Sequence, residues 1–436
     1  MERIYFDNAA TTSLDPEVLE AMMPYFTDKF GNPSSIYSYG RESRMAIEQA
    51  RKSVAKILGA KPSEIFFTSG GTESSNTALH AAMFDLGCKH IISSPIEHHA
   101  TLHTVSHLAK TAGVTLSYVN ILPNGHIDLI HLQNLLESNT DKTIVSIMHA
   151  NNEIGNMIDL QKVGEICKTH NAYFHSDTVQ TVGHFSFNLK ETPIDFITGA
   201  GHKFHGPKGI GILYINENIK INPYLHGGAQ ERNMRAGTEN VYGIVGFAKA
   251  LEIATEQHEK DSTYINGLRR YMHEQLLAQI PEVSFNGDTF GDSLYTLLSV
   301  NFPKNEKSEM MLFNLDIHHI CASGGSACSS GAQQGSHVIN AITKAENIAR
   351  DKSIVHAALR NSVFWLLLIS LTVYSMIFSI FTYHMYPMLL YKQIPVGEVV
   401  FALSIIGPAQ VLGRIIISRF ASRVSMRTLG SIMLSL

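Results

Sequence analysis

Cysteine is scarce in this sequence: four of its 436 residues carry a thiol, Cys88, Cys167, Cys321 and Cys328. They show neither a Cys-x-x-Cys spacing nor the pairing pattern of a secreted scaffold, so we expect no zinc site and no disulfide framework. The first residues, 1–7, lack an apolar run after a basic start, so we expect no secretory signal peptide. Reduced thiols and a cytoplasmic location follow as expectations.

A strong charge of either sign is also missing. The net charge of -4 gives no indication of nucleic-acid binding. Charged residues are spread over roughly the first 340 positions, as in a soluble globular protein, but none occurs from Phe364 to Tyr383. An uncharged stretch of this length just spans the hydrocarbon core of a bilayer. The composition therefore predicts a soluble part followed by a different kind of segment.

Apolar runs alternate with helical patterns over residues 1–255. One helical pattern starts with an expected N-cap at Asp15 and Pro16 at the first helical position. This alternation predicts an α/β fold with a mostly parallel sheet covered by helices. The runs that suit buried strands are Ile65–Thr68, Ile91–Ser94, Thr143–Met148, Ala172–Ser176, Asp195–Thr198 and Gly211–Ile215.

A turn of small residues, Ser69-Gly70-Gly71-Thr72-Glu73, lies between the first of these strands and a helical pattern. Such a turn exposes backbone N–H groups at a helix N-terminus and suits a phosphate. A tight corner without a ligand is the alternative interpretation.

Two further segments follow strands, where ligands bind in open α/β sheets. Asp177 ends the strand before Thr178-Val179-Gln180, and its carboxylate could keep a ring nitrogen protonated. The alternative interpretation is that Asp177 is an ordinary helix N-cap. Lys203 lies between two histidines in the glycine-rich stretch 199–209. A lysine amine can bond to the aldehyde of a cofactor, but a solvated basic loop is the simpler interpretation of an isolated lysine.

Cys328 lies in the small-residue stretch Ser323-Gly-Gly-Ser-Ala-Cys328-Ser-Ser-Gly331. Such a stretch indicates an exposed loop, where a thiol has the access that a nucleophile needs, although most cysteines are inert. A phosphate cradle, a carboxylate at a strand end and a Schiff-base lysine are together what pyridoxal phosphate requires.

These residues resemble the cysteine desulfurases of the NifS/IscS type, within the class V aminotransferase superfamily, over about residues 3–342. The resemblance rests on the motifs Tyr5-Phe-Asp-Asn-Ala-Ala-Thr-Thr12, Asn32-Pro-Ser-Ser35, Thr68-Ser-Gly-Gly-Thr-Glu73, Glu97-His-His-Ala100, Asn151-Asn-Glu-Ile-Gly155 and Arg235-Ala-Gly-Thr238.

The resemblance implies a role for each matching residue. It implies that Lys203 is the Schiff-base lysine and Cys328 the nucleophile that takes sulfur, in a mobile loop that delivers it. The remaining implied cofactor contacts are Gly71, Thr72 and His202 at the phosphate, Asp177 at the ring nitrogen, Gln180 at the phenolic oxygen, His98 stacked on the ring, Asn152 near the substrate carboxylate, and Thr238 from the other subunit of a homodimer.

The resemblance also implies the activity: L-cysteine is converted to alanine, and its sulfur is left as a persulfide on Cys328. The implied partners are a second copy of the chain and a sulfur acceptor or iron–sulfur scaffold protein. No resident metal is expected, although a role of Cys328 in cluster transfer is compatible with the family.

The implied fold is the aspartate-aminotransferase-like fold type I of pyridoxal-phosphate enzymes. We expect a large cofactor-binding domain over residues 15–255 and a smaller domain from residues 1–14 and 256–342. Two departures stand out: Ala200 occupies a position where the family often has serine, and the family's arginine-bearing strand is not found after Ile342. The smaller domain therefore looks truncated, and catalysis by this chain is an open question.

Two rival interpretations remain. The first is another pyridoxal-phosphate enzyme, such as a selenocysteine lyase or an aminotransferase, although an aminotransferase needs no thiol at Cys328. The second is a membrane-associated protein whose enzyme domain is inactive, which the missing arginine favours.

The tail, residues 343–436, has apolar stretches at 364–383 and 399–417. Basic residues on their outer flanks predict two transmembrane helices with both ends in the cytoplasm. The stretch Gly413–Arg423 resembles a loop motif of major-facilitator transporters, but two spans cannot form a transport path. A membrane tether and a gene-level chimera are both compatible with this sequence.

Overall fold

The computed structural model describes residues 3–305, 308–325, 336–401 and 404. The chain divides into two compact units, residues 1–349 and 350–436. The first unit contains the predicted cofactor-site residues, and the second contains most of the predicted tail.

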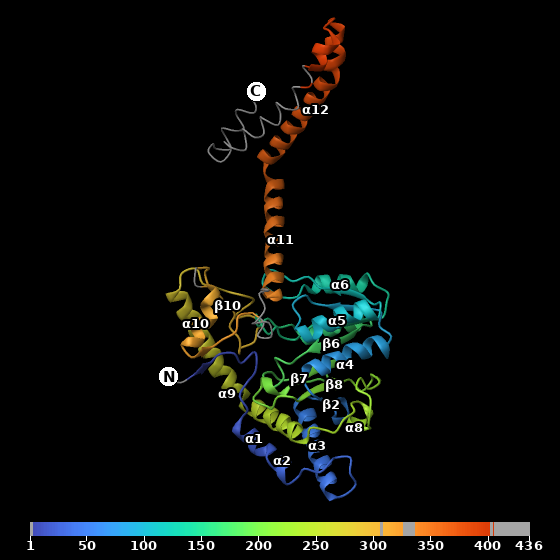
Figure 1. The fold of residues 1–436 in the computed structure, drawn as a ribbon, viewed down its shortest axis with the longest axis vertical. Coiled ribbons are helices and arrows are strands. Elements are labelled where there is room, and N and C mark those ends of the chain that lie inside the picture. Colours follow the sequence, from blue (N-terminus) through green and yellow to red (C-terminus); the bar gives the residue numbers. More distant parts are fainter. Residues whose placement is uncertain (1–2, 306–307, 326–335, 402–403, 405–436) are drawn as a thin grey trace. The chain divides into compact units, whose positions relative to one another are not determined.

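A seven-stranded sheet lies at the centre of the first unit (Figure 1). Its strand order is β2-β8-β7-β6-β5-β3-β4, and β8 runs antiparallel to both of its neighbours while the pairs from β7 to β4 are parallel. The prediction of a mostly parallel sheet is confirmed. The strands are β2 (Ile65–Thr68), β3 (His90–Ser93), β4 (Thr115–Tyr118), β5 (Thr143–Ser146), β6 (Tyr173–Asp177), β7 (Phe196–Ala200) and β8 (Gly211–Ile215).

The six predicted strands are present, with ends shifted by at most two residues. Strand β4 was not predicted, because it is a partly exposed edge strand and lacks the continuous apolar run of a central strand. The predicted start of α1 is also correct: Pro16 is its first residue, and the Asp15 carboxylate accepts from the Glu17 N–H at 2.8 Å.

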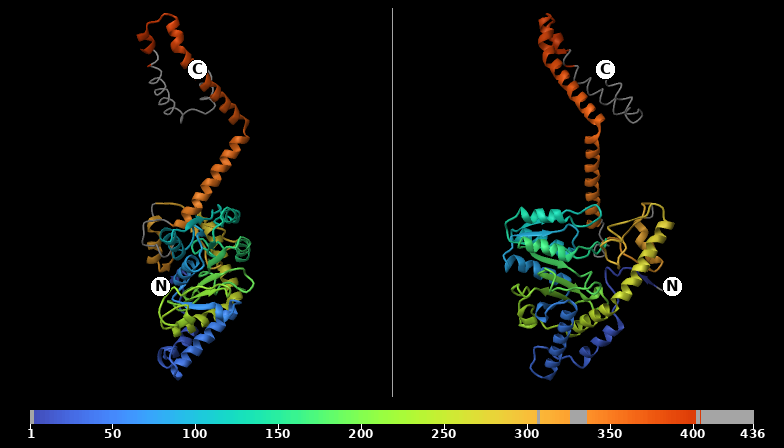
Figure 2. Two further views of the ribbon diagram at one scale, coloured as in Figure 1. Left: turned by 90° about the vertical axis from the view of Figure 1, so that its right-hand side faces the viewer. Right: turned by 180° about the vertical axis from the view of Figure 1, so that it is seen from behind.

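Side chains that alternate along the strands divide the core between the two faces of the sheet. Phe67 and Val145 contribute to one apolar cluster, whereas their neighbours Phe66 and Ile144 contribute to the other. Helices α4 (Gly71–Phe84) and α5 (His99–Thr111) bury their apolar residues in the second cluster. The opposite face is covered by α1 (Pro16–Met22), α3 (Ser38–Ile57), α6 (Leu129–Glu137), α7 (Leu160–Thr169) and α9 (Val241–Gln279), as the views in Figure 2 show.

Short strands join distant parts of the first unit. β1 (Ile4–Tyr5) pairs in parallel with β11 (Ile320–Cys321), and β9 (Ser284–Phe285) pairs antiparallel with β10 (Val300–Asn301). The hydroxyl of Ser323 donates to Asp7 at 2.8 Å, which extends the first contact. The remaining helical segments are α2 (Pro24–Thr27), η1 (Pro62–Glu64), η2 (Gly201–Lys203), α8 (Gln230–Asn233), η3 (Ser308–Met310) and α10 (Met311–Ile317).

A buried ion pair fixes the turn at α8. Arg51 donates to Glu231 through Nη1 at 2.7 Å and through Nη2 at 2.9 Å, and both residues are at most 4% exposed. The same carboxylate accepts from the Phe67 N–H at 2.9 Å, so it links the turn to β2. Glu231, Arg232 and Asn233 have φ values of 44°, 58° and 65°. Such left-handed residues persist only where their surroundings hold them.

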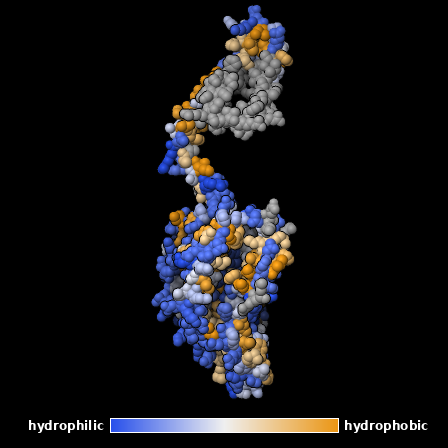
Figure 3. Space-filling model, turned by 90° about the vertical axis from the view of Figure 1, so that its left-hand side faces the viewer, coloured by the Kyte–Doolittle hydropathy of each residue, from blue (hydrophilic) through white to orange (hydrophobic). Residues whose placement is uncertain are grey.

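Helix α11 (His337–Arg360) continues into the tail and is followed by α12 (Ser362–Tyr391), which begins where the Asn361 side chain accepts from the Val363 N–H at 2.9 Å. Hydrophobic residues occur along the described part of the tail (Figure 3). In the part of the chain that the structure describes, no single helix meets the length and hydropathy of a membrane span. The stretches 337–357 and 362–377 reach the required length and hydropathy only when they are taken together, and the two helices are bent by 74° at the break between them. The span predicted over 364–383 is therefore not supported as a single membrane helix, and most of the predicted span 399–417 lies outside the described residues.

We predict that Glu231→Gln lowers the free energy of unfolding by about 3 kcal/mol, because the buried Arg51 guanidinium then keeps only the half-exposed carboxylate of Glu48, 3.1 Å from its Nε, as a counter-charge. Urea denaturation followed by circular dichroism measures this difference.

The control is Lys61→Met, which breaks an exposed ion pair with Glu217 at 2.5 Å and should change stability little. Equal losses in the two variants would contradict the role assigned to the buried pair.

Candidate active site

Six strands, β2 to β7, end at one edge of the sheet, and a predicted site residue lies at or after the end of five of them. Thr72 follows β2, His98 follows β3, Asn152 follows β5, Asp177 ends β6, and Lys203 follows β7. These five strands run in the same direction, so their carboxyl ends meet at one edge. The sheet therefore brings together residues that are far apart in the sequence.

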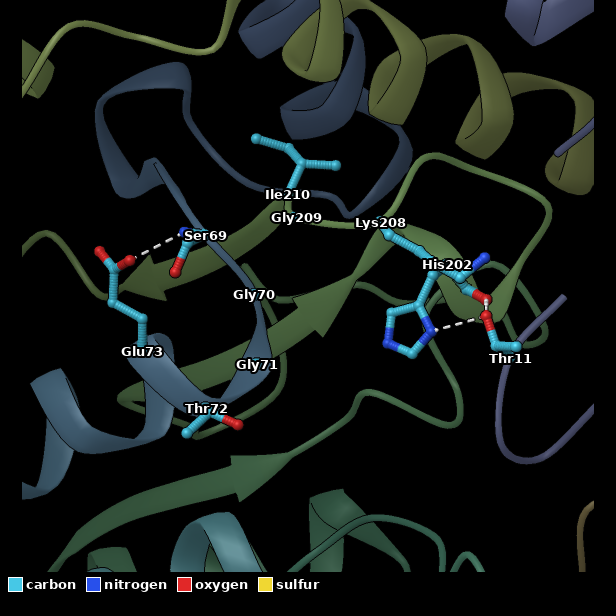
Figure 4. A pocket seen from close by; sticks show the side chains of 10 residues that line it. All are labelled: Thr11, Ser69, Gly70, Gly71, Thr72, Glu73, His202, Lys208, Gly209 and Ile210. Atoms are coloured by element: carbon cyan, nitrogen blue, oxygen red, sulfur yellow. Dashed lines mark hydrogen bonds between the residues drawn. The ribbon is translucent and has the colours of Figure 1, made fainter. Parts of the chain in front are cut away.

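A cavity of about 390 Å³ lies at the N-terminus of α4 (Figure 4). Gly71 allows a close approach here, since a Cβ atom at this position would lie 2.5 Å from a methyl carbon of Val179. The first N–H groups of a helix have no partner within the helix, and together with the positive end of the dipole they favour an anion. The lining consists of Thr11, Ser69, Gly70, Gly71, Thr72, Glu73, His202, Lys208, Gly209 and Ile210.

His202 and Lys208 contribute to the cavity from the glycine-rich stretch after β7. Burial lowers the pKa of His202 to about 4, and the charges of Lys203 and Lys208 act in the same direction. His202 is therefore neutral near pH 7. Its Nδ1 lies 3.1 Å from the hydroxyl of Thr11, as drawn in Figure 4. Thr11 was not assigned a role from the sequence, although the motif that contains it carried part of the resemblance.

The loop that carries Thr238 is tied to α4 by an ion pair. Arg235 donates to Glu73 through Nε at 2.9 Å and through Nη2 at 3.1 Å. Burial opposes ionisation of Glu73, but the hydrogen bonds from Arg235 and Ser69 outweigh it and lower the pKa of this carboxyl. Thr238 itself is exposed and does not line the cavity formed by Thr72 and His202.

Asp177 is buried at the end of β6, with 6% of its surface exposed. One of its oxygens, Oδ1, accepts from the Val179 N–H at 3.0 Å and from the hydroxyl of Thr198 at 3.3 Å. Gln180 lies one turn further on, and its amide donates to the carbonyl of Ala9 at 3.0 Å. The Asp177 carboxylate is thus held in one orientation by neighbouring strands and by its own turn.

The Lys203 amine lies against the N-terminal segment. It donates to the carbonyls of Ala9 and Ala10, the latter at 3.0 Å. Thr12 adds two bonds to the carbonyl of His202, from its N–H at 2.9 Å and from its hydroxyl at 3.0 Å. Residues 9–12 therefore form one wall of the lysine site, and motif matching alone did not reveal this function.

His98 is the N-cap of α5, and its Nδ1 accepts from the Ala100 N–H at 3.1 Å. Burial lowers the pKa of His98; the nearby charges of Lys203 and His337 contribute, while that of Asp177 opposes them. His98 therefore lies within electrostatic range of both Lys203 and Asp177, as the predicted site requires. Asn152 is half-buried in a turn that Asn151 shapes by accepting from two backbone N–H groups.

Glu97, directly before His98, is fully buried. Its carboxyl accepts from the Met148 N–H at 3.0 Å and is hydrogen-bonded to Ser94 at 2.6 Å. Burial raises the pKa of Glu97 to about 8, so the acid retains its proton at neutral pH. This residue links the ends of β3 and β5 beneath His98, a role that the sequence did not reveal.

The predicted nucleophile, Cys328, lies outside the described residues. Among the other thiols, burial raises the pKa of Cys88 to about 12 and also raises that of Cys167, which makes both poor nucleophiles. Cys321 is partly exposed on β11. Ala200 is buried at the end of β7 and supplies no hydroxyl there.

The residues present fit pyridoxal phosphate. The helix N-terminus at Gly71 and Thr72, with neutral His202 and cationic Lys208 nearby, suits a phosphate monoester. The Lys203 amine and the Asp177 carboxylate supply the groups that an aldehyde and a pyridine nitrogen need. Across the described ranges, no cluster of three or more His, Cys, Asp or Glu side chains could hold a metal ion.

The chain belongs to the aminotransferase class-V family, which matches residues 4–363. Within this class, the chain is similar to proteins named cysteine desulfurase IscS. The one from Dictyoglomus turgidum is 45% identical over 341 residues, which cover 78% of this chain and 85% of that protein. The one from Methanosarcina thermophila is 45% identical over 363 residues, covering 83% and 87% of the two chains.

Solved structures of NifS-like proteins also match this chain. A NifS-like protein matches with a TM-score of 0.72 and 39% identity, covering 78% of this chain and 90% of its own. A NifS-like protein from Rickettsia africae matches with a TM-score of 0.69 and 32% identity, covering 78% of this chain and 90% of its own.

The expected family, fold type I and the pyridoxal-phosphate cofactor are thereby confirmed. The family match reaches residue 363, beyond the expected limit near Ile342. The resemblance of the tail to transporters is not supported by these comparisons.

We predict that Glu97→Gln stabilises the cofactor-free protein relative to the parent increasingly as the pH rises from about 4.5 to 8. In the parent, the unfolded carboxyl ionises near its ordinary pKa, whereas the folded carboxyl keeps its proton until about pH 8. The folded state therefore binds more protons in this range, and its stability falls as the pH rises. Glutamine does not titrate, and its amide oxygen can still accept from Ser94 and from the Met148 N–H, as Oε1 of Glu97 does. Urea midpoints at pH 5, 6.5 and 8 measure the difference, and a pH-independent difference would contradict the prediction.

Proposed function

We propose that this protein is a pyridoxal-phosphate-dependent cysteine desulfurase, which converts L-cysteine to L-alanine and retains the sulfur as a persulfide. The observation that carries the proposal is the convergence of Lys203, Asp177 and His98 at one sheet edge, beside the phosphate-type cavity of α4. The 45% identity to curated cysteine desulfurases supports this choice of reaction.

Thr72, His202 and the first N–H groups of α4 would hold the cofactor's phosphate, with Lys208 adding positive charge. Asp177 would hold a proton on the ring nitrogen, and His98 would lie against the ring. When bound, pyridoxal phosphate supplies an aldehyde that bonds to amines and a ring that withdraws electrons from Cα. Lys203 would take the proton from the substrate Cα, a transfer typically worth about 10²–10⁴-fold in rate.

The Cys328 thiolate would attack the sulfur of the substrate. The Cβ–S bond of cysteine breaks, an S–S bond forms on Cys328, and the Cβ carbon gains a proton, so that cysteine and an enzyme thiol yield alanine and an enzyme persulfide. A thiol reductant or a sulfur acceptor protein would then remove the outer sulfur and restore Cys328.

We predict that the purified protein releases alanine and sulfide from cysteine in the presence of a thiol reductant. Lys203→Ala should abolish the absorbance of the lysine-bound cofactor and lower turnover at least 100-fold. Cys328→Ser should retain the cofactor but release no sulfide.

Cys321→Ser is the matched control, because this partly exposed thiol lies on β11 and is not the predicted nucleophile. Cofactor binding without sulfide release in the parent would favour a catalytically impaired domain, and release of selenide alone, from selenocysteine, would favour a selenocysteine lyase.

A homodimer is the second part of the proposal, with Thr238 reaching the phosphate site of the partner subunit. Its loop is held by Arg235 and Glu73, yet Thr238 is exposed within one chain. Large apolar side chains are also exposed near residues 26–45, including Phe30 at 68% and Ile36 at 88%. Exposed apolar groups of this size suit burial against a second copy.

Mixing subunits tests this arrangement. Lys203→Ala and Thr238→Ala homodimers should each be less active than the parent. A heterodimer should regain one intact site, because the subunit with Lys203 receives Thr238 from its partner. Sulfide release after mixing and exchange measures the recovery. An absence of recovery in confirmed heterodimers would show that Thr238 serves its own chain.

A further inference from the structure

The turn after β6 packs directly on the segment that carries Lys203. Gly183, in this turn, has a φ of 84°, and a Cβ atom at this position would lie 2.6 Å from the Cβ and Cγ atoms of Phe204. The following residue, His184, is thereby brought against the backbone of Lys203. No sequence motif implied a role for His184.

His184 makes two hydrogen bonds through its ring. Nε2 lies 3.0 Å from the carbonyl oxygen of Lys203, and Nδ1 lies 3.1 Å from the hydroxyl of Tyr295. A carbonyl oxygen can only accept, so Nε2 carries the proton; in a neutral ring Nδ1 then accepts from the Tyr295 hydroxyl. Burial lowers the pKa of His184, and the hydrogen bond to the Lys203 carbonyl opposes this shift without outweighing it, which agrees with a neutral ring.

Tyr295 belongs to a segment that also supports the turn of Asn152. Tyr295 is 7% exposed and packs against Phe185, with ring centroids 5.7 Å apart. Its neighbour Leu294 donates from its N–H to the carbonyl of Gly155 at 2.9 Å. The hydrogen bonds of His184 therefore connect the backbone of Lys203 to the segment that also holds the turn of Asn152.

We propose that His184 is a positioning residue for Lys203: its Nε2–H holds the Lys203 carbonyl, and Tyr295 orients the imidazole. The proposal rests on the proposed function for the chemistry of Lys203. The side chain of Lys203 extends from the backbone that this bond holds, so the placement of its amine depends on the bond. Loss of the donor should displace the amine from the position in which it bonds to the cofactor's aldehyde.

Two amide variants separate this role from simple packing. The amide nitrogen of glutamine reaches about as far as Nε2 of histidine, whereas the asparagine amide reaches only as far as Nδ1. We expect His184→Asn to weaken capture of pyridoxal phosphate by the cofactor-free protein about tenfold, and His184→Gln to retain affinity within about twofold of the parent. Tyr295→Phe should weaken capture by a smaller factor.

Three measurements are made on each full-length variant: the dissociation constant of pyridoxal phosphate, the pH titration of the lysine-bound chromophore, and the yield of borohydride-trapped cofactor on the Lys203 peptide. The melting temperature without cofactor serves as the folding control. The proposal predicts a shifted chromophore titration in His184→Asn and a parental one in His184→Gln. Equal behaviour of the two amide variants, or a tenfold loss that parallels a fall in melting temperature in both, would overturn it.

Failure of the positioning role of His184 and failure of the proposed function would give different results. A parent protein that traps the cofactor on Lys203 but releases no sulfide would contradict the desulfurase, while the comparison of the His184 variants would still decide the positioning role.

Discussion

The common direction of five strands is the constraint on which the site depends. β2, β3, β5, β6 and β7 end at the same edge of the sheet, so their following turns converge there. Both faces of the sheet are covered by helices, and burial on both sides fixes the register of each strand. Asp177 and Lys203 are brought together in this way without any local sequence relationship between them.

Polar contacts, one of them fully buried, then hold the turns in place. The Arg51–Glu231 pair links α3, β2 and the strained turn of α8, while the Glu73–Arg235 pair links the start of α4 to the loop of Thr238. The N-terminal segment adds its own carbonyls around the Lys203 amine. A buried pair such as Arg51–Glu231 contributes little net stability over apolar packing, but it becomes costly when one partner is removed. The effect of these contacts is therefore to specify geometry, which a cofactor site requires.

Much of the fold and part of the site were predictable. The strands were found because fully buried strands form continuous apolar runs, and the partly exposed β4 was missed because it does not. Lys203, Asp177 and Thr72 were proposed as site residues because they lie at or just after strand ends and within motifs of the family. Glu97, His184 and the carbonyls of Ala9 and Ala10 were not, since their roles depend on burial and on contacts between distant segments. The tail was interpreted as a membrane span from its composition, but within the described residues its helices pass that test only as a bent pair.

The sequence by itself determined the α/β class, the strand positions, the family and the chemical groups available to the cofactor, because these depend on local patterns and on matching motifs. The tertiary structure alone decided which titratable side chains are neutral and which atoms they bond to through hydrogen bonds. Burial sets the pKa of Glu97 near 8 and that of His202 near 4, and no local pattern reveals that desolvation. The same holds for the bond from His184 to the Lys203 carbonyl, which exists because the turn after β6 and the segment after β7 are packed side by side by the sheet.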